Sequence, residues 1–300
     1  MSTVATHAVH DRLAIEVAPV ERVLYWGKQI VIAQFSCRPD HPHFFGTGPI
    51  RTPVCGFPRK SASVAINDER PFLADPTVAV LLNRGDHYRR NVVSEEGDRS
   101  DLIGVDEELL ADVIASVDPA ALDRAGTARF PTASAPVDLA AYHLIHVLIA
   151  RLKNGYPASD LEVEESVLDT LGAVLRGSVN QRGMTHGNGR SKAISVVRET
   201  KAYLLTHVEQ SCCLKEIAKA VNVSPFHLAH IFRDETGTTL HQYLLQLKLR
   251  SSLDLLPNSH GNLTGLAMKL GFSSHSHFTD LFRKAFGTPP SSFAGAVQRA

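Results

Sequence analysis

The chain has 300 residues, 44% of them hydrophobic and 21% charged, a balance typical of soluble globular proteins that excludes disordered, collagen and coiled-coil classes. The length is typical of two domains. Lys plus Arg equals Asp plus Glu at 31 each, but residues 190–300 hold 13 basic and 7 acidic side chains, whereas the rest of the chain holds 18 and 24. A basic C-terminal part beside an acidic N-terminal part indicates that the C-terminal part meets a polyanion.

The four cysteines lack the paired spacings of a disulfide framework or a zinc ribbon, which favours a reducing cytoplasm. Adjacent Cys212 and Cys213 are expected to be packed or half-buried thiols, because neighbouring cysteines rarely pair without strain. No export signal is visible at the start, and no segment reaches the roughly 18 apolar residues of a membrane span. We therefore expect a soluble, cytoplasmic protein with no membrane partner.

Short apolar stretches separated by Gly, Pro and Asp predict strands between about residues 13 and 105. Such spacing is typical of an antiparallel sandwich or small barrel. The predicted strands cover residues 31–37, 61–66, 78–83, 88–93 and 101–105.

From Asp106 the apolar spacing becomes helical behind an acidic first turn, and longer helices are predicted over 137–153 and about 160–179. The helix at 137–153 is apolar nearly all round, so it is buried on several sides, either within one subunit or against a second one. Residues 181–192 have no periodicity and three glycines, which predicts a linker.

The C-terminal part carries one helical pattern twice. In the first copy, an apolar face over 214–221 precedes a second helix that Ser224 caps, Pro225 opens and Gly237 stops. Its predicted inner residues are Leu228, Ile231 and Phe232, and its predicted outer residues are Phe226, His227, Ala229, His230 and Arg233.

The second copy spans 263–287, with a turn at Gly271 and a helix opened by Ser273 or Ser274. Its predicted inner residues are Phe278, Leu281, Phe282 and Phe286, and its predicted outer residues are His275, Ser276, Thr279, Asp280, Arg283 and Lys284. A helix, a short turn and an amphipathic second helix with an exposed polar start is how a helix-turn-helix addresses the major groove. A connecting helix over 240–256 is expected to hold both copies toward successive major grooves, roughly 34 Å apart.

Residues from about 194 to 293 resemble the AraC/XylS class of bacterial transcription regulators. The stretch GFSSHSHFTDLFRKAFGTPPSSF, at 271–293, follows the family's glycine-phenylalanine turn, its spaced aromatics and its closing Gly, Pro and aromatic. The first copy fits through its serine-opened helix, Phe232 and Gly237. The family usually has arginine where Lys248 stands and alanine where Ser252 stands.

This resemblance implies that base edges are contacted from the exposed early positions of each second helix. Ala229 has no hydrogen bond to offer and Asp280 could read only a cytosine amino group, so both rank below the other positions. The base contacts implied are Phe226, His230, His275, Ser276 and Thr279. The phosphate contacts expected are Arg233, Lys248, Arg250, Arg283 and Lys284.

The N-terminal strands resemble, more loosely, the cupin-like sensor domain of many family members, which binds a small effector or mediates dimerisation. The predicted fold class is α+β. It has a cupin-like barrel or sandwich with appended helices over 1–180, a linker over 181–192, and an all-helical domain with two helix-turn-helix units joined by a long helix over 193–300.

The leading hypothesis is a sequence-specific transcription regulator, and not an enzyme, that binds a double-stranded DNA operator as a homodimer. Control by an unknown small-molecule effector, activation, RNA polymerase as a further partner and the absence of a cofactor belong to this hypothesis. No hydrolase elbow, P-loop or dinucleotide motif occurs in the sequence. A dimeric regulator that senses no effector fits the sequence as well.

The competing hypothesis is a metal-binding cupin enzyme with a helical partner-binding tail. His41 and His43 have a metal-ligand spacing that His87 and Asp86 would have to complete, but Pro42 disfavours a central strand. His143 and His146 lie three residues apart on a predicted helix without a carboxylate at fitting spacing. No metal is expected, and metal analysis of the purified protein would distinguish the two hypotheses.

Overall fold

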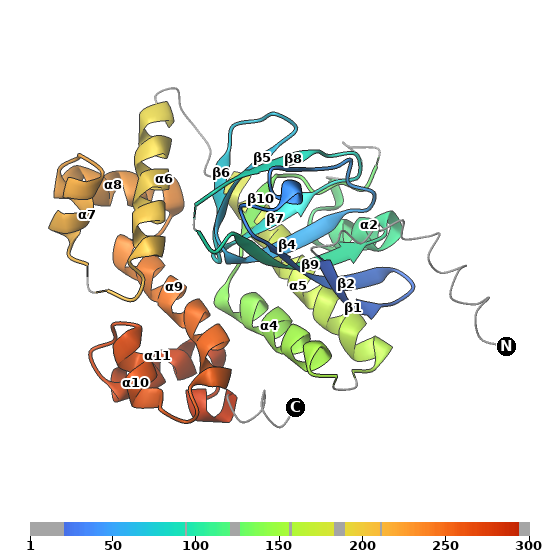
Figure 1. The fold of residues 1–300 in the computed structure, drawn as a ribbon. Coiled ribbons are helices and arrows are strands. Elements are labelled where there is room, and N and C mark those ends of the chain that lie inside the picture. Colours follow the sequence, from blue (N-terminus) through green and yellow to red (C-terminus); the bar gives the residue numbers. More distant parts are fainter. Residues whose placement is uncertain are drawn as a thin grey trace. The chain divides into compact units, whose positions relative to one another are not determined.

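The computed structural model describes residues 21–93, 95–120, 127–155, 158–182, 190–210 and 212–293. The chain divides into two compact units, Met1–Met184 (unit 1) and Thr185–Ala300 (unit 2), shown in Figure 1. Unit 1 combines strands and helices, whereas the described residues of unit 2 form helices and turns. Within the described ranges, no helix has the length and apolar character needed to cross a lipid bilayer.

Unit 1 is built on two antiparallel sheets. One sheet has six strands in the order β1-β2-β9-β4-β7-β10, and the other has four in the order β3-β8-β5-β6. The strands are β1 (Glu21–Trp26), β2 (Ile30–Cys37), β3 (Gly46–Thr47), β4 (Val54–Lys60), β5 (Ala62–Ile66), β6 (Phe72–Ala74), β7 (Val78–Leu82), β8 (Tyr88–Asn91), β9 (Asp98–Val105) and β10 (Ser134–Pro136). The five predicted strands are confirmed, with shifted ends, as β2, β5, β7, β8 and β9.

The core of unit 1 lies where side chains of both sheets meet. Val64 and Ile66 of β5 pack in one buried cluster with Leu82 of β7. A buried ion pair, Arg90 Nη1 to Asp98 Oδ2 at 3.2 Å, lies close by, and the Arg90 guanidinium stands 4.3 Å from the ring centre of Phe35. Burial raises the pKa of Asp98, and the charge of Arg90 opposes that rise. Paired in this way, the two charges are accommodated in an apolar core.

Two helices of unit 1, α2 and α4, begin at aspartate caps. Asp106 accepts a hydrogen bond from the amide of Leu109 at 2.8 Å, and Asp138 accepts one from the amide of Ala141 at 2.7 Å. A 3-10 turn, η1, spans Pro42–Phe44. The helices are α2 (Glu107–Val117), α4 (Leu139–Lys153) and α5 (Asp160–Arg182).

Helices extend into both ends of the predicted linker at 181–192. Helix α5 continues to Arg182 and helix α6 begins at Arg190, and residues 183–189 lie outside the described residues. No glycine or proline follows Val179 until Gly183, so the chain offers α5 no stop signal at the place where the periodicity fades.

Unit 2 contains six described α-helices and one 3-10 turn. The helices α7 and α8 lie near one end of α9, and α10 and α11 lie near its other end (Figure 1). Buried residues of α6, α7, α8 and the first half of α9 share one core cluster, which includes Leu204, Leu228 and Phe232. The elements are α6 (Arg190–Thr206), α7 (Leu214–Ala220), α8 (Pro225–Thr236), α9 (Leu240–Leu255), η2 (Leu256–Asn258), α10 (Leu263–Lys269) and α11 (His275–Phe286).

Candidate nucleic-acid interface

Helices α8 and α11, called here the reading helices, begin and end in the same way. The hydroxyl of Ser224 accepts a hydrogen bond from the amide of His227 at 3.2 Å, and that of Ser274 accepts one from the amide of His277 at 3.1 Å. Each helix has 12 residues and is followed by a glycine in the left-handed region. Because the caps lie 50 positions apart, each residue of α8 has a counterpart in α11 at its own number plus 50.

Five of the seven predicted inner residues of the reading helices are buried, and Ile231 and Leu281 are half-buried. Leu228 and Phe232 of α8 are fully buried, as are Phe278 and Phe282 of α11. The ring centres of Phe232 and Tyr243 lie 5.4 Å apart, so α8 packs against α9 through an edge-to-face aromatic contact. Each reading helix is therefore anchored through one side, which leaves the opposite side for recognition.

The outer faces carry the five residues predicted to contact bases. Phe226 is 76% exposed and lies against His230, with ring centres 4.5 Å apart. His275 and Ser276 are exposed, while Thr279 is half-buried with its hydroxyl 3.4 Å from Nε2 of His275. Each set lies on the first two turns of its helix, where side chains of a helix-turn-helix reach base edges.

The five predicted phosphate contacts separate into two groups. Arg233, Arg283 and Lys284 are exposed on the reading helices. Lys248 and Arg250 are buried within α9, so the prediction that these two contact phosphates is wrong for this structure. Arg250 is fully buried, and its Nη1 donates to Oε1 of Gln246 at 3.0 Å.

Buried Lys248 makes structural contacts that no local sequence signal indicates. Its Nζ donates to the carbonyl of Gly271 at 3.1 Å and lies 5.8 Å from the ring centre of Phe272. Desolvation lowers the pKa of Lys248, partly offset by Cys212. The lysine thus connects α9 to the turn between α10 and α11. Since 247–250 are all buried, α9 is covered on every side there, a pattern that a helix connecting two cores would show.

A second contact joins the two halves of unit 2. Lys269 at the end of α10 pairs with Glu209, which follows α6, at 3.5 Å. Gly271 has a φ of +66°, and a Cβ there would come within 2.8 Å of Nζ of Lys248. Glycine at this turn therefore serves both the left-handed backbone and the close approach of the lysine.

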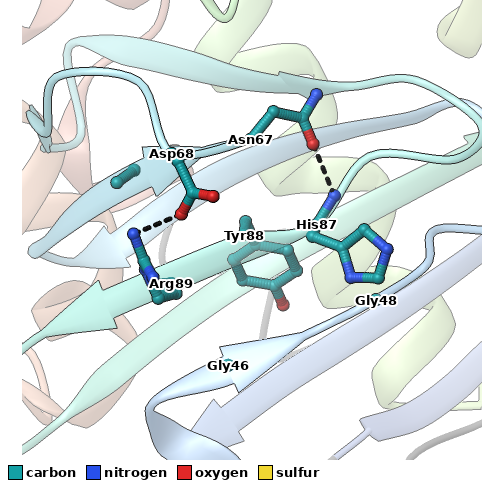
Figure 2. A pocket seen from close by; sticks show the side chains of 8 residues that line it. Gly46, Gly48, Asn67, Asp68, His87, Tyr88 and Arg89 are labelled. Carbon is teal, nitrogen blue, oxygen red and sulfur yellow. Dashed lines mark hydrogen bonds and ion pairs between the residues drawn. The ribbon is translucent and has the colours of Figure 1, made fainter.

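Unit 1 carries a polar hollow of about 430 Å³ on its four-stranded sheet (Figure 2). Asp68 forms an ion pair with Arg89, and Oδ1 of Asn67 accepts a hydrogen bond from the amide of His87 at 2.8 Å. Its lining residues are Gly46, Gly48, Ala65, Asn67, Asp68, His87, Tyr88 and Arg89. Charged and amide groups of this kind suit a polar small molecule.

Two of the residues considered as metal ligands, Asp86 and His146, have other partners. Asp86 accepts hydrogen bonds from the amide of Asn83 at 2.8 Å and from Nδ2 of Asn67 at 2.7 Å. His146 of α4 is buried, and its Nδ1 contacts Arg59, which is ion-paired with Asp101. In the part of the chain that the structure describes, no three His, Cys, Asp or Glu side chains are grouped so as to hold a metal ion; the side chain of His43 lies outside that part.

The cysteine pair precedes α7 as two separate thiols. Cys212 is half-buried and Cys213 is exposed. Burial, and secondarily the charge of Glu216, raises the pKa of Cys212 above its ordinary value. A raised pKa leaves little thiolate at neutral pH, so Cys212 is a weak nucleophile.

Comparison with known proteins shows what this arrangement resembles. A family model described as a helix-turn-helix domain matches residues 217–296. The Msm operon regulatory protein of Streptococcus mutans is 30% identical over 115 residues, 38% of this chain and 41% of the relative. Unit 2 contains a helix-turn-helix domain. The HTH-type transcriptional activator RhaS of Salmonella newport is 27% identical over 143 residues, 48% of this chain and 49% of RhaS.

The chain thus spans about half the length, or less, of these curated relatives, which are named as regulatory proteins and not as enzymes. A Chromobacterium violaceum transcriptional regulator with an AraC-type DNA-binding domain is 25% identical over 34% of this chain and 92% of its own, with a TM-score of 0.33. Apo ToxT of Vibrio cholerae is 11% identical over 90% of this chain and 98% of its own, with a TM-score of 0.38. The assignment of the helix-turn-helix domain rests on the sequence matches.

Proposed function

We propose that this protein is a sequence-specific DNA-binding transcription regulator that reads bases with α8 and α11. The observation that carries the proposal is the pair of reading helices with matched caps, buried inner residues and exposed first turns, within a helix-turn-helix domain. The excess of basic residues over 190–300 supports it, because neutralising phosphates provides most of the sequence-independent affinity for DNA.

In this proposal the residues of the reading helices divide by role. Phe226 and His230 of α8, and His275, Ser276 and Thr279 of α11, contact base edges. Phe226 has no hydrogen-bonding group, so its recognition would be an apolar contact with a thymine methyl, whereas the imidazoles and hydroxyls exchange hydrogen bonds. Arg233, Arg283 and Lys284 contact phosphates and set the register on the duplex.

Unit 1 has the role of control in this proposal. Its two antiparallel sheets support the predicted cupin-like architecture, and its polar hollow is where we place a small effector. Effector binding or pairing of two copies would act on unit 2 only through a difference in affinity between two states. A cytoplasmic homodimer that activates transcription together with RNA polymerase completes the proposal.

The test begins with selection of a binding site from a pool of random 30-base-pair duplexes, using the full chain. Two double variants, Phe226→Ala with His230→Ala and His275→Ala with Thr279→Ala, are then compared by fluorescence anisotropy on the selected duplex and on a random duplex. Each should lose about 10- to 100-fold in discrimination, at different base positions for the two helices. The exposed Thr264→Ala on α10 serves as the control and should discriminate as the unchanged protein does. Unaltered discrimination in both double variants would show that α8 and α11 do not read bases.

A further inference from the structure

A second hollow, of about 480 Å³, lies within unit 2 beside the outer face of α8. We call it the apolar hollow. Its lining residues come from α6, α7, α8, the start of α9 and the short segments between them. They are Leu204, Cys212, Leu214, Ile217, Phe226, Ala229, His230, Arg233, Thr239, Leu240, His241 and Leu244.

The lining is chiefly aliphatic. Leu204 and Ile217 are buried, and Leu240 and Leu244 of α9 are half-buried beside them. The volume lies within the range of roughly 300 to 1,000 Å³ that small-molecule sites occupy. A surface of this kind gains free energy when apolar area replaces water on it.

The apolar hollow is also lined by basic side chains, and no acidic side chain is among its lining residues. Arg233, His230 and His241 are exposed, and none of the 12 lining residues is Asp or Glu. Arg233 has no ion-pair or hydrogen-bond partner for its guanidinium among the residues that the structure describes. An unpaired guanidinium at an aliphatic hollow favours a ligand that carries a carboxylate or sulfonate at one end.

We infer that the apolar hollow binds a small amphipathic anion, with its apolar body against the leucines and its anionic group at Arg233. Phe226, His230 and Arg233 belong both to this hollow and to the proposed DNA-contacting set, so the ligand and the duplex compete for α8. The competition between ligand and duplex rests on the proposed function.

The second reading helix has a different surface at the equivalent positions. Where α8 has Phe226, Ala229 and His230, α11 has Ser276, Thr279 and Asp280. A carboxylate there repels an anion, and hydroxyls offer less apolar area. Competition is therefore confined to α8, and contacts made by α11 persist in the presence of the ligand.

The binding test uses the full chain and 8-anilinonaphthalene-1-sulfonate, an aromatic anion whose fluorescence rises in apolar sites. We expect saturable binding of one molecule per chain, displaced by octanoate but not by octanol or acetate at the same concentration. Displacement by octanol as effective as that by octanoate would overturn the anionic requirement. Dye binding that falls as the protein concentration rises would show that a second copy covers the hollow, and would also overturn the inference.

The matched variants are Arg233→Gln and Arg283→Gln, which change counterpart positions of the two reading helices. Arg233→Gln should weaken dye binding about tenfold or more, the effect of losing a charged hydrogen bond, and Arg283→Gln should leave it unchanged. Circular dichroism establishes that both variants are folded. Equal dye affinity in the two variants would place the ligand away from Arg233. His241→Glu, which adds a negative charge at an exposed lining position, should weaken the dye as well.

The competition test measures anisotropy of a labelled random 30-base-pair duplex at low salt, with octanoate and with sodium acetate at equal ionic strength. Octanoate should lower the duplex affinity several-fold, and acetate should not. Dye binding without competition would overturn the shared use of α8. Absence of duplex binding by the unchanged protein would instead refute the proposed function, and the dye experiment would still decide whether the hollow takes an anion.

Discussion

The two helix pairs of unit 2, α7 with α8 and α10 with α11, have the same backbone signals and different exposed side chains. Serine caps and left-handed glycines recur at a spacing of 50 residues, and each inner face has two fully buried residues, Leu228 and Phe232 in α8 and Phe278 and Phe282 in α11. The outer faces differ, because α8 has Phe226 and Ala229 where α11 has Ser276 and Thr279. Duplicated backbone signals therefore maintain one geometry while the exposed positions vary. Under the proposed function, the two reading helices would contact different base sequences.

The cores behind the reading helices differ as well. Phe232 meets the ring of Tyr243 from α9, whereas Phe282 lies in a row of phenylalanines, with ring centres 5.7 Å from Phe278, 4.6 Å from Phe286 and 6.0 Å from Phe293. The second pair is stabilised by aromatic contacts mostly within its own segment, and the first pair depends more on α6 and α9.

The largest effect should come from emptying these cores. Phe232→Ala and Phe282→Ala should each lower the free energy of unfolding by about 3–5 kcal/mol, with Phe282→Ala at the upper end because it loses three ring contacts. Urea denaturation measures the loss, and hydrogen exchange should show α11 opening before α8 in Phe282→Ala. The exposed Phe226→Ala is the control and should change stability by no more than about 0.5 kcal/mol. Equal opening of α8 and α11 in Phe282→Ala would show that the pairs do not differ in this way.

A smaller effect on stability is expected from substituting the turn glycines Gly287 and Gly271. Gly287→Ala should cost about 1–2 kcal/mol, because its φ of +74° is left-handed but no atom lies within 4 Å of the added Cβ. Gly271→Ala should cost about 1 kcal/mol more, because its Cβ also displaces Lys248 from its carbonyl partner. Thermal unfolding of both variants provides the measurement. Equal losses would mean that the Lys248 contact contributes nothing.

The salt dependence of DNA binding separates the exposed arginines from the buried lysine. Arg283→Gln should weaken binding to any duplex several-fold and reduce the slope of log affinity against log salt by about 0.9. Lys248→Gln should leave the slope unchanged while lowering the melting temperature, since its charge is used inside unit 2. Anisotropy titrations from about 50 to 200 mM salt measure both slopes. A reduced slope in Lys248→Gln would restore the sequence-based assignment of that lysine to phosphate.

The smallest effect concerns the first helix of each pair. Glu216 accepts the amide of Cys213 at 2.9 Å at the start of α7, and this hydrogen bond holds the pKa of Glu216 below its ordinary value of 4.5. The stabilisation is present above pH 4.5 and is lost as the pH falls through the lowered pKa. At α10 the cap is the neutral Asn262, which accepts from the amide of Gly265.

Amide chemical shifts recorded from about pH 6 to 3 test this contrast. The Cys213 amide should titrate with Glu216 at a pH below 4.5, and the Gly265 amide should not follow it. Glu216→Gln should remove the titration of the Cys213 amide. A midpoint at or above 4.5 would contradict the cap.

Local signals explain which elements the sequence reveals. The ends of α8 are set by residues at or next to them, namely Ser224, Pro225 and Gly237. The position and the inner face of α8 could therefore be predicted from the sequence. Lys248 and Arg250 were misassigned because their burial arises from elements distant in sequence, and a charged side chain on a helix is ordinarily exposed. Helix α5 ends at Arg182 and not near 179, because its apolar period fades before the helix stops. Neither hollow has a sequence signature, since its walls come from separate segments.

The link from Lys248 to the carbonyl of Gly271 bears on how an operator can be spaced. Each added base pair rotates one half-site relative to the other by about 35° around the duplex axis. The two reading helices are connected through the ammonium group of Lys248 and through the packed helix α9. They can therefore rotate little relative to each other to follow the half-sites. Inserting or deleting one base pair between half-sites should therefore abolish simultaneous engagement, and weakening the fastening at Lys248 should broaden the spacings that are tolerated.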